Sequence, residues 1–242
     1  MKLKMHQQLK SVNFFSNCHL ILAVDHGFSL GPVEGLEDPI KFLDSINIKK
    51  IDGIIAHRGI IKYLNQDRYT GKIIMHITGG GLSPGLNKEK FLVATPKEAL
   101  LYGACAVSVQ INIGSHSELE QIETAGRILG EAKIVGLPVL GMIYDINRTM
   151  STSYLVRMGI ELGFDCIKVD PGMSPNDFKK IVDISPVPIV IAGGAKKNKE
   201  SFLQEIQAYI ASGVSGVSVG RNIFQDSEPD ILINQISDYV HK

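Results

Sequence analysis

Phe164-Asp165-Cys166-Ile167-Lys168 is a short apolar run between two stretches of amphipathic helical periodicity, residues 151–162 and 175–183. A run of this length and composition indicates a buried β-strand. Short strands that alternate with helical stretches are typical of a parallel sheet whose strands are joined by crossover helices. The segment therefore predicts an α/β fold in which Lys168, the polar residue that ends the run, lies near the carboxyl end of a parallel strand.

The same pattern recurs along the chain and predicts eight strands, at 20–25, 53–56, 73–77, 104–111, 138–144, 166–169, 187–192 and 216–220. Helices are expected at 96–102, 117–135, 151–162, 175–183, 199–212 and 229–240. Eight such units in 242 residues favour a closed (β/α)8 TIM barrel. An open doubly wound sheet is the alternative, but Gly-x-Gly-x-x-Gly is absent after the first strand, where Asp25-His26-Gly27-Phe28-Ser29-Leu30-Gly31 stands. No linker or composition shift divides the chain, so residues 1–242 are expected to form a single domain.

The composition favours a protein with a large apolar core and no strong overall charge. Lysine plus arginine and aspartate plus glutamate number 25 each, so neither nucleic acid nor an anionic membrane is an expected partner. The three cysteines are widely spaced and odd in number, which fits a reducing cytoplasm. The first 18 residues contain no apolar stretch long enough for a signal peptide or a membrane span. They are expected to form a short lead-in helix that covers one end of the fold.

Lys168 is a candidate nucleophile because an ammonium group is costly to place in a buried strand. A lysine in a partly dry pocket loses affinity for its proton, and its neutral amine can then attack a carbonyl to form a Schiff base. The alternative is a lysine that begins the next loop and extends its ammonium group to solvent. The segment alone leaves both interpretations open.

Other polar residues end the expected strands, and the carboxyl ends of the strands are where barrel enzymes carry out their chemistry. They are Asp25, His26, His57, Arg58, His76, Thr78, Asn112, Ser115, Tyr144, Asp145 and Asp170, with Gly79, Gly80 and Gly81 after the third strand. A lysine, a tyrosine, carboxylates and histidines are thus expected at one end of the barrel. The alternative for any one of them is a polar side chain that meets solvent at the rim.

Glycines end the last two expected strands, in Ile191-Ala192-Gly193-Gly194 and Val219-Gly220-Arg221-Asn222. Glycine allows backbone N–H groups to approach an anion, and Arg221 adds a bidentate cation. Many barrels bind phosphate after these two strands. The pattern predicts a phosphate site here, although glycines at a strand end can also serve only to turn the chain.

Five segments resemble the archaeal-type class I aldolase family, and together they extend over nearly the whole chain. They are residues 24–32 (VDHGFSLGP), 76–84 (HITGGGLSP), 107–115 (VSVQINIGS), 190–194 (VIAGG) and 219–225 (VGRNIFQ). Within the family they look most similar to the heptulosonate synthases that make aminohydroxybenzoate precursors. The resemblance implies a metal-independent TIM-barrel enzyme that needs no cofactor and forms a homo-oligomer based on pentameric rings.

The resemblance also implies roles for individual residues. Lys168 would form an iminium with a ketone donor, Tyr144 would transfer the proton that accompanies carbon–carbon bond cleavage or formation, and Asp25 would be the second acid/base group. The expected substrate- and phosphate-binding residues are Gly193, Gly194, Gly220, Arg221, Gly80, His26 and Asp170. The expected partners are a phosphorylated sugar and an aldehyde such as aspartate semialdehyde, in an aromatic-precursor pathway. A class I fructose-1,6-bisphosphate aldolase, a related acyl-transferring thiolase and a non-catalytic phosphate-binding barrel are the alternatives.

The sequence departs from the family pattern after two strands. Tyr144 is followed by Asp145-Ile146-Asn147-Arg148 where the family commonly has Pro-Arg-Gly. Val169-Asp170-Pro171-Gly172 follows Lys168 in place of Thr-x-Tyr-Thr-Gly. If the strand continues, Asp170 lies on the face of Lys168, where it would stabilise a protonated amine or bind an amino group of the acceptor. Its alternative role is to begin a turn.

Three histidines near strand ends, His26, His57 and His76, offer a metal-dependent alternative in which zinc polarises a carbonyl. They lack a tight ligand motif such as His-x-x-x-His, so no metal site is predicted. Strand alternation would direct the neighbours Asp25 and His26 to opposite faces, and one of the two is therefore expected to face away from the pocket.

Overall fold

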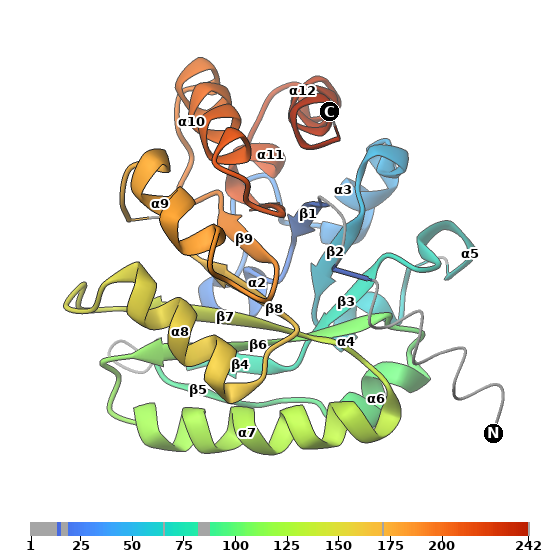
Figure 1. Cartoon of the computed structure of the whole chain (residues 1–242). Helices are drawn as coiled ribbons and strands as arrows, with labels where there is room; N and C mark the ends of the chain where they lie inside the picture. Colours follow the sequence, from blue (N-terminus) through green and yellow to red (C-terminus); the bar gives the residue numbers. More distant parts are fainter. Residues whose placement is uncertain (1–13, 16–18, 65, 82–87, 171, 242) are drawn as a thin grey trace, which may run out of the picture.

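Eight parallel strands close into a barrel, and helices surround it (Figure 1). The computed structural model describes residues 14–15, 19–64, 66–81, 88–170 and 172–241. The strands are β1 (His19–Ala23), β2 (Gly53–Ala56), β3 (Ile73–His76), β6 (Ala106–Ile113), β7 (Val139–Asp145), β8 (Cys166–Val169), β9 (Ile189–Ala192) and β10 (Gly216–Val219). Their order around the barrel is β1-β10-β9-β8-β7-β6-β3-β2. The predicted (β/α)8 barrel is confirmed, and every predicted strand is present.

The six predicted helices are present within two residues of their expected ends: α6 (Pro96–Leu101), α7 (Glu118–Val135), α8 (Thr152–Leu162), α9 (Pro175–Val182), α10 (Lys199–Ala211) and α12 (Pro229–Val240). The sequence did not predict α2 (Gly27–Leu30), α3 (Pro39–Ser45), η1 (Ile48–Lys50), α4 (Arg58–Ile61), α5 (Gln66–Tyr69), α11 (Arg221–Phe224) or the antiparallel hairpin of β4 (Thr78–Gly80) and β5 (Lys90–Leu92). Most of these elements are about one turn long or shorter, which is too short for a helical period to show. The expected lead-in helix lies outside the described residues, apart from Phe14 and Phe15.

Two layers of apolar side chains hold the barrel together. The outer layer packs the barrel against the helices and includes Leu22, Ile54 and Ile167. The inner layer fills the barrel itself, where side chains such as Ile21 and Leu140 meet. Because successive side chains on a strand point to opposite faces, seven of the eight barrel strands contribute to both layers, whereas β10 contributes apolar side chains only to the outer one.

The barrel closes between its first and last strands. His19 of β1 stands opposite Gly216 of β10, and a side chain at Gly216 would have its Cβ 2.2 Å from the carbonyl oxygen of His19. Gly216 also has a φ of 146°, a conformation that favours glycine. Only a residue without a side chain allows the two strands to pair this closely.

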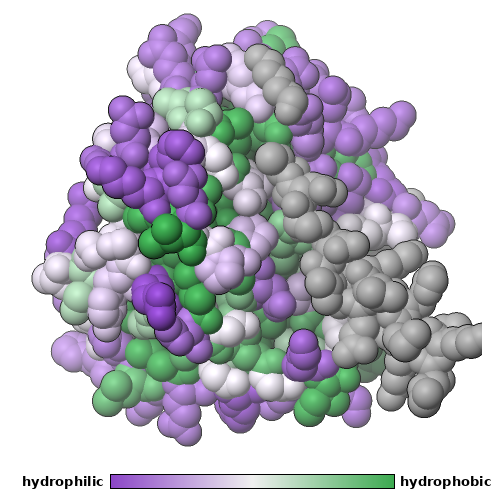
Figure 2. All heavy atoms as spheres, viewed as in Figure 1, coloured by the Kyte–Doolittle hydropathy of each residue, from purple (hydrophilic) through white to green (hydrophobic). Residues whose placement is uncertain are grey.

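The face of the molecule in Figure 2, viewed as in Figure 1, is largely hydrophilic over the helical rim, and hydrophobic side chains show between the helices. This distribution matches amphipathic helices that cover a barrel. Among the described residues, no helix combines the length and the apolar character that a membrane span requires.

Candidate active site

Side chains alternate along each strand, and this alternation determines which polar residues point into the barrel at the carboxyl ends of the strands. The inner apolar layer includes Ile21 and Ala23 of β1, and the next inward position on this chain segment is Asp25. In the same way Cys166 leads to Lys168 on β8. His57, His76 and Tyr144 occupy the corresponding positions after β2, on β3 and on β7. The predicted candidates Lys168, Tyr144 and Asp25 therefore share one end of the barrel, at the carboxyl ends of the strands.

Lys168 is 6% exposed and lies between β7 and β9, opposite Met142 and Val190. Burial lowers the pKa of its ammonium group, and the negative charges of Asp25 and Asp170 offset only part of this effect. The amine thus loses its proton at a lower pH than a free lysine. The buried position is not that of a lysine that extends to solvent.

Tyr144 stands on β7 two residues beyond Met142, the neighbour of Lys168, and its ring packs on the inner apolar layer. Burial raises the pKa of its hydroxyl well above the usual value, and the carboxylates of Asp170 and Asp25 raise it further. Arg221 acts in the opposite direction. The phenol therefore stays protonated at neutral pH and can donate a proton beside Lys168.

Asp25 is held as an anion in the same site. Burial alone would raise its pKa, but the basic groups around it, His76 first and then His26, Lys168 and His57, lower the pKa to about 2. Its Oδ2 lies 3.9 Å from Nε2 of His76. Burial lowers the pKa of His76 to about 3, so this ring is neutral across the neutral range. Asp25 thus provides a permanent negative charge close to the nucleophile.

Ser108 and Thr78 orient the His76 ring. Nδ1 of His76 is 2.9 Å from the Ser108 hydroxyl, and Nε2 is 3.3 Å from the Thr78 hydroxyl. Ser108 is not evident from the sequence, because a small polar residue within an apolar strand gives no signal of its own.

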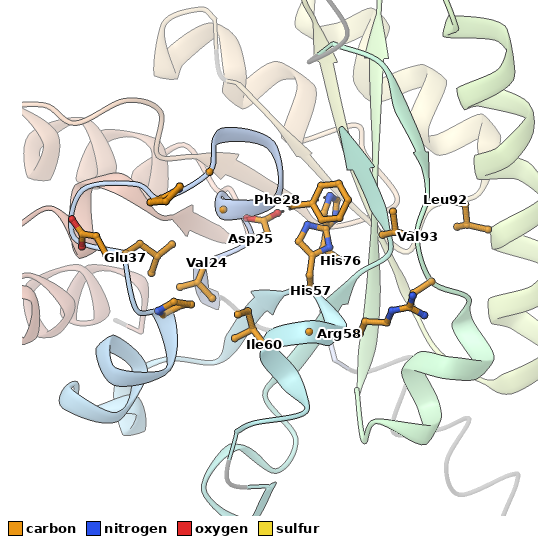
Figure 3. Close-up of a pocket in the computed structure, with 17 residues that line it drawn as sticks. Val24, Asp25, Phe28, Glu37, His57, Arg58, Ile60, His76, Leu92 and Val93 are labelled. Atoms are coloured by element: carbon orange, nitrogen blue, oxygen red, sulfur yellow. Dashed lines mark ion pairs between the residues drawn. The ribbon is translucent and has the colours of Figure 1, made fainter. Parts of the chain in front are cut away.

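A cavity of about 850 Å³ opens beside Asp25 on the side of β1, β2 and β3. Figure 3 shows Phe28, His57 and His76 close to Asp25, and the Phe28 and His57 ring centroids are 4.8 Å apart. Apolar side chains including Val24, Ile60 and Leu92 complete the wall. A volume of this size and a mostly apolar lining with few polar groups are typical of small-molecule sites.

His26 does not follow the alternation expected from the sequence. β1 ends at Ala23, and His26 has helical backbone angles (φ −61°, ψ −34°) at the start of α2. Its ring packs edge-on against Phe224 at 5.2 Å, and its Nδ1 lies 3.6 Å from Oδ1 of Asp25. The two side chains thus lie near each other beyond the end of β1, but only Asp25 is among the residues that line the cavity. The expectation that one of the two faces away from the pocket stays a prediction.

Gly220 and Gly193 allow the ends of β10 and β9 to approach their surroundings closely. A Cβ at Gly220 would lie 2.4 Å from the His26 ring, and one at Gly193 would lie 3.2 Å from Val219. Gly194 has a φ of 71°, in the left-handed region. Nε of Arg221 is buried and has no hydrogen-bond partner among the described residues. An unpaired guanidinium N–H beside two glycine-rich turns is an arrangement that can bind an anion.

Asn222 fixes these two turns to each other. Its Nδ2 donates to the carbonyls of Gly193 and Ala195, at 2.9 Å each, and its Oδ1 accepts the N–H of Lys197 at 2.9 Å. In the sequence, Asn222 stands out only as part of the Val219-Gly220-Arg221-Asn222 motif. A buried amide that satisfies three backbone groups has a positioning role.

Asp170 follows β8 at the mouth of the barrel. Burial raises the pKa of its carboxyl, while Lys168, Arg148 and Arg221 act to lower it. Its carboxyl group therefore lies within electrostatic reach of the nucleophile and of the glycine turns. Pro171, in the turn expected to begin at Asp170, lies outside the described residues.

Several strand-end residues make contacts at the rim of the barrel, and one of them, Arg58, also lines the cavity beside Asp25. Arg58 Nη1 donates to Glu98 at 2.8 Å, and the Asp145 carboxylate accepts the N–H groups of Asn147 and Met150. Asn112 donates to the carbonyl of Lys88 at 2.7 Å. The contacts of these three residues match the alternative interpretation, in which polar groups at the strand ends stabilise the rim.

The histidines at the mouth do not form a metal-binding group. Within the described part of the chain, no three His, Cys, Asp or Glu side chains are arranged to hold a metal ion.

Gly80, another predicted site residue, lies in β4 opposite Lys90 of β5, in the hairpin that follows β3.

Comparisons with known proteins agree with this geometry. The model of the DeoC/LacD family aldolases matches residues 19–226. The chain is 34% identical over 229 residues to 2-amino-3,7-dideoxy-D-threo-hept-6-ulosonate synthase 1 of Archaeoglobus fulgidus, covering 92% of this chain and 85% of the relative. It is 28% identical over 230 residues to 2-amino-4,5-dihydroxy-6-oxo-7-(phosphonooxy)heptanoate synthase of Streptomyces griseus, covering 91% of this chain and 84% of the relative.

A solved structure adds direct evidence on the chemistry of a relative. An archaeal fructose-1,6-bisphosphate aldolase, with its catalytic lysine covalently bound to the carbinolamine intermediate, superposes with a TM-score of 0.84. It is 25% identical, and the match covers 98% of this chain and all of that one (100%). The protein therefore belongs to the DeoC/LacD family of aldolases and is an aldolase of the class I, lysine Schiff-base type.

Proposed function

We propose that Lys168 is the Schiff-base lysine and that the protein joins or cleaves a phosphorylated ketose-type donor and an aldehyde. The observation that carries this proposal is the buried ammonium group of Lys168, whose pKa is lowered by burial next to the anion of Asp25. A lysine in such a site supplies a neutral amine at ordinary pH.

The chemistry follows from the ionisation of the three residues. The neutral amine of Lys168 adds to the ketone carbon of the donor, and the resulting carbinolamine loses water to give a protonated iminium. In the cleavage direction Tyr144, in the phenolate form that remains after the synthetic step, takes the proton of the hydroxyl that becomes the aldehyde. The iminium accepts the electron pair of the breaking carbon–carbon bond, so that the acceptor leaves as an aldehyde and the donor remains as an enamine. In the synthetic direction Tyr144 donates its proton to the aldehyde oxygen as the bond forms. Asp25 stabilises the positive nitrogen.

The donor phosphate is proposed to bind after β9 and β10. The support for this is the unpaired Nε of Arg221 between the glycine turns of Gly193-Gly194 and Gly220. His26 packs on Gly220, and its buried ring nitrogen Nδ1, 3.6 Å from Asp25, has no hydrogen-bond partner among the described residues. A phosphate here would place the ketone of a short donor toward β8, the strand that carries Lys168.

The acceptor is proposed to be an amino-aldehyde such as aspartate semialdehyde, as part of an aromatic-precursor pathway. The names of the two curated relatives describe amino-substituted seven-carbon products, and one of these products carries a phosphate. Asp170 offers a carboxylate to an amino group at the mouth. A fructose-1,6-bisphosphate aldolase is the second candidate, and the superposed archaeal aldolase favours it.

Borohydride reduction tests the nucleophile. With a ketose phosphate such as dihydroxyacetone phosphate, it should trap one adduct, located on Lys168 by peptide mass analysis. Lys168→Met should abolish both the adduct and turnover while the circular dichroism spectrum stays unchanged. Tyr144→Phe is the matched variant, because it keeps the lysine and removes only the hydroxyl. It should still form the adduct while turnover falls about 100-fold or more. An adduct on a different lysine would disprove the assignment.

A further inference from the structure

The β4–β5 hairpin lies over the mouth of the barrel, above β3 and β6. Its strands pair with Thr78 opposite Leu92 and Gly80 opposite Lys90. The Thr78 hydroxyl accepts the N–H of Gln110 on β6 at 2.9 Å, which fixes the hairpin to the barrel wall. Residues that oppose each other in a hairpin, or stand two apart, share a face, so Lys90 lies on the face of Thr78.

Glu89 and Lys90, which are adjacent in the sequence, point in different directions. The Glu89 carboxylate accepts the N–H groups of His116 at 3.1 Å and of Ser117 at 2.9 Å, in the turn before α7. Glu89 therefore faces α7, on the outside of the barrel. Lys90 instead shares the face of Thr78, whose hydroxyl lies 3.3 Å from Nε2 of His76 at the mouth. The positive charge of Lys90 acts on the rings of His57 and His76 at the ends of β2 and β3, which places it on that side of the mouth.

Lys90 places a partly buried positive charge at the mouth. Among the described residues its ammonium group takes part in no hydrogen bond and no ion pair, although the side chain is half-buried. Asp25 attracts it, but the two side chains form no ion pair, and the Asp25 anion also attracts the ammonium group of Lys168. A partly desolvated cation without a counter-ion favours an anionic ligand.

Lys90 and Arg221 lie on opposite sides of the barrel mouth. β9 and β10 are neighbours, and β3 and β6 are neighbours. Two strands separate these pairs on either side, β1 and β2 one way and β7 and β8 the other. Lys168, on β8, stands between the two cations. A linear substrate that spans the mouth would thus meet one cation at each end.

We propose that Lys90 binds an anionic group at the acceptor end of the substrate and selects acceptors that carry one. The chemical class is an aldehyde with a terminal phosphate or carboxylate. This proposal rests on the proposed function: if the donor phosphate binds at Arg221, the opposite end of the substrate, near Lys90, comes from the acceptor.

The test uses unreactive ligands, so that it does not depend on Schiff-base chemistry. Calorimetry would compare glucitol 6-phosphate, which has one anionic end, with glucitol 1,6-bisphosphate and 6-phosphogluconate, which have two. The wild-type protein should bind at least one doubly anionic ligand about tenfold or more tightly than glucitol 6-phosphate, the scale of a hydrogen bond between charged groups. The stronger of the two gains identifies phosphate or carboxylate as the preferred group.

Lys90→Met should abolish the gain and leave the affinity for glucitol 6-phosphate unchanged, while Lys90→Arg should restore most of it. Lys97→Met, which removes an exposed lysine of α6, is the control and should behave as wild type. The proposal is overturned if a second anionic end adds no affinity in the wild type, or if Lys90→Met retains the gain. Borohydride trapping at Lys168, measured separately, shows whether the proposed function itself holds.

Discussion

Lys168 and Asp25 have opposite ionisation preferences in the same dry site. Burial favours the neutral form of each, which lowers the pKa of the lysine and acts to raise that of the carboxyl. Each residue also stabilises the charged form of the other. The amine can therefore release its proton for attack, while the iminium that replaces it still has an anion beside it.

Replacing Asp25 with asparagine tests this coupling through pH. Because Asp25 raises the pKa of Lys168, its loss should lower that pKa further. The rate of borohydride-trapped adduct formation rises with pH as the amine loses its proton, so the midpoint of this rise should move to lower pH in Asp25→Asn. Turnover should fall, since the iminium loses its anion. Glu123→Gln, at an exposed site on α7, should leave the midpoint in place. A midpoint that moves upward would contradict the coupling.

At the residue scale, the sequence revealed the candidates that interrupt apolar strands. Lys168 and Tyr144 stand out because a cation and a phenol at inward positions of a barrel have few structural uses. Lys90 could not be found in this way, since it belongs to a three-residue strand in a hairpin that no periodicity predicts. Its position depends on the pairing with β4 and on Glu89, and both are tertiary facts.

At the scale of elements, the ends of β9 and β10 act as one unit. Asn222 of α11 bridges the turn after β9, and Lys196 adds an ion pair to Asp226 at 2.8 Å. The sequence predicted both glycine turns but not the amide that joins them. Strand and helix positions were predictable because each βα unit repeats the same apolar period, whereas the link between two units has no periodic pattern.

Arg221→Ala should weaken binding of a phosphorylated donor by about 2 kcal/mol, the scale of a hydrogen bond to a charged group in a partly desolvated site. Affinity for the dephosphorylated donor should be the same in the variant and in wild type, because the lost interaction involves the phosphate alone. Titration of both proteins with both donors measures this double difference. Arg127→Ala, which removes an exposed arginine of α7, is the matched control. If Arg221→Ala lost the same binding affinity for both donors, Arg221 would not be the residue that recognises the phosphate.

At the scale of the whole molecule, the two ends of the barrel have different tasks. The carboxyl end gathers Asp25, Tyr144 and Lys168, whereas at the other end Phe15 is 2% exposed and packs on the inner apolar layer. In barrels of this type, residues at the amino-terminal end contribute to stability and not to chemistry. Two expectations stay predictions: that residues 1–242 form a single domain, and that the protein forms a homo-oligomer.

Asp52 links three elements at the stability end. Its Oδ2 accepts the N–H of Leu20 on β1 at 2.8 Å and lies 2.9 Å from Nε2 of His241, which follows α12. Asp52→Ala would leave the Leu20 N–H without this partner, so the free energy of unfolding should fall by about 1–3 kcal/mol. Urea denaturation measures this loss. Turnover at 25 °C should stay the same, because Asp52 lies at the end of the barrel opposite Lys168.

Asp238→Ala separates this effect from a general loss of charge near α12. Asp238 forms an exposed pair with Lys50 at 3.9 Å, and such surface pairs contribute about 0–1 kcal/mol. Its variant should unfold close to the wild-type urea midpoint. The division between a catalytic end and a stability end would be wrong if Asp52→Ala reduced turnover while its free energy of unfolding stayed at the wild-type value. A change at the base of the barrel would then affect the chemistry at Lys168 without destabilising the fold.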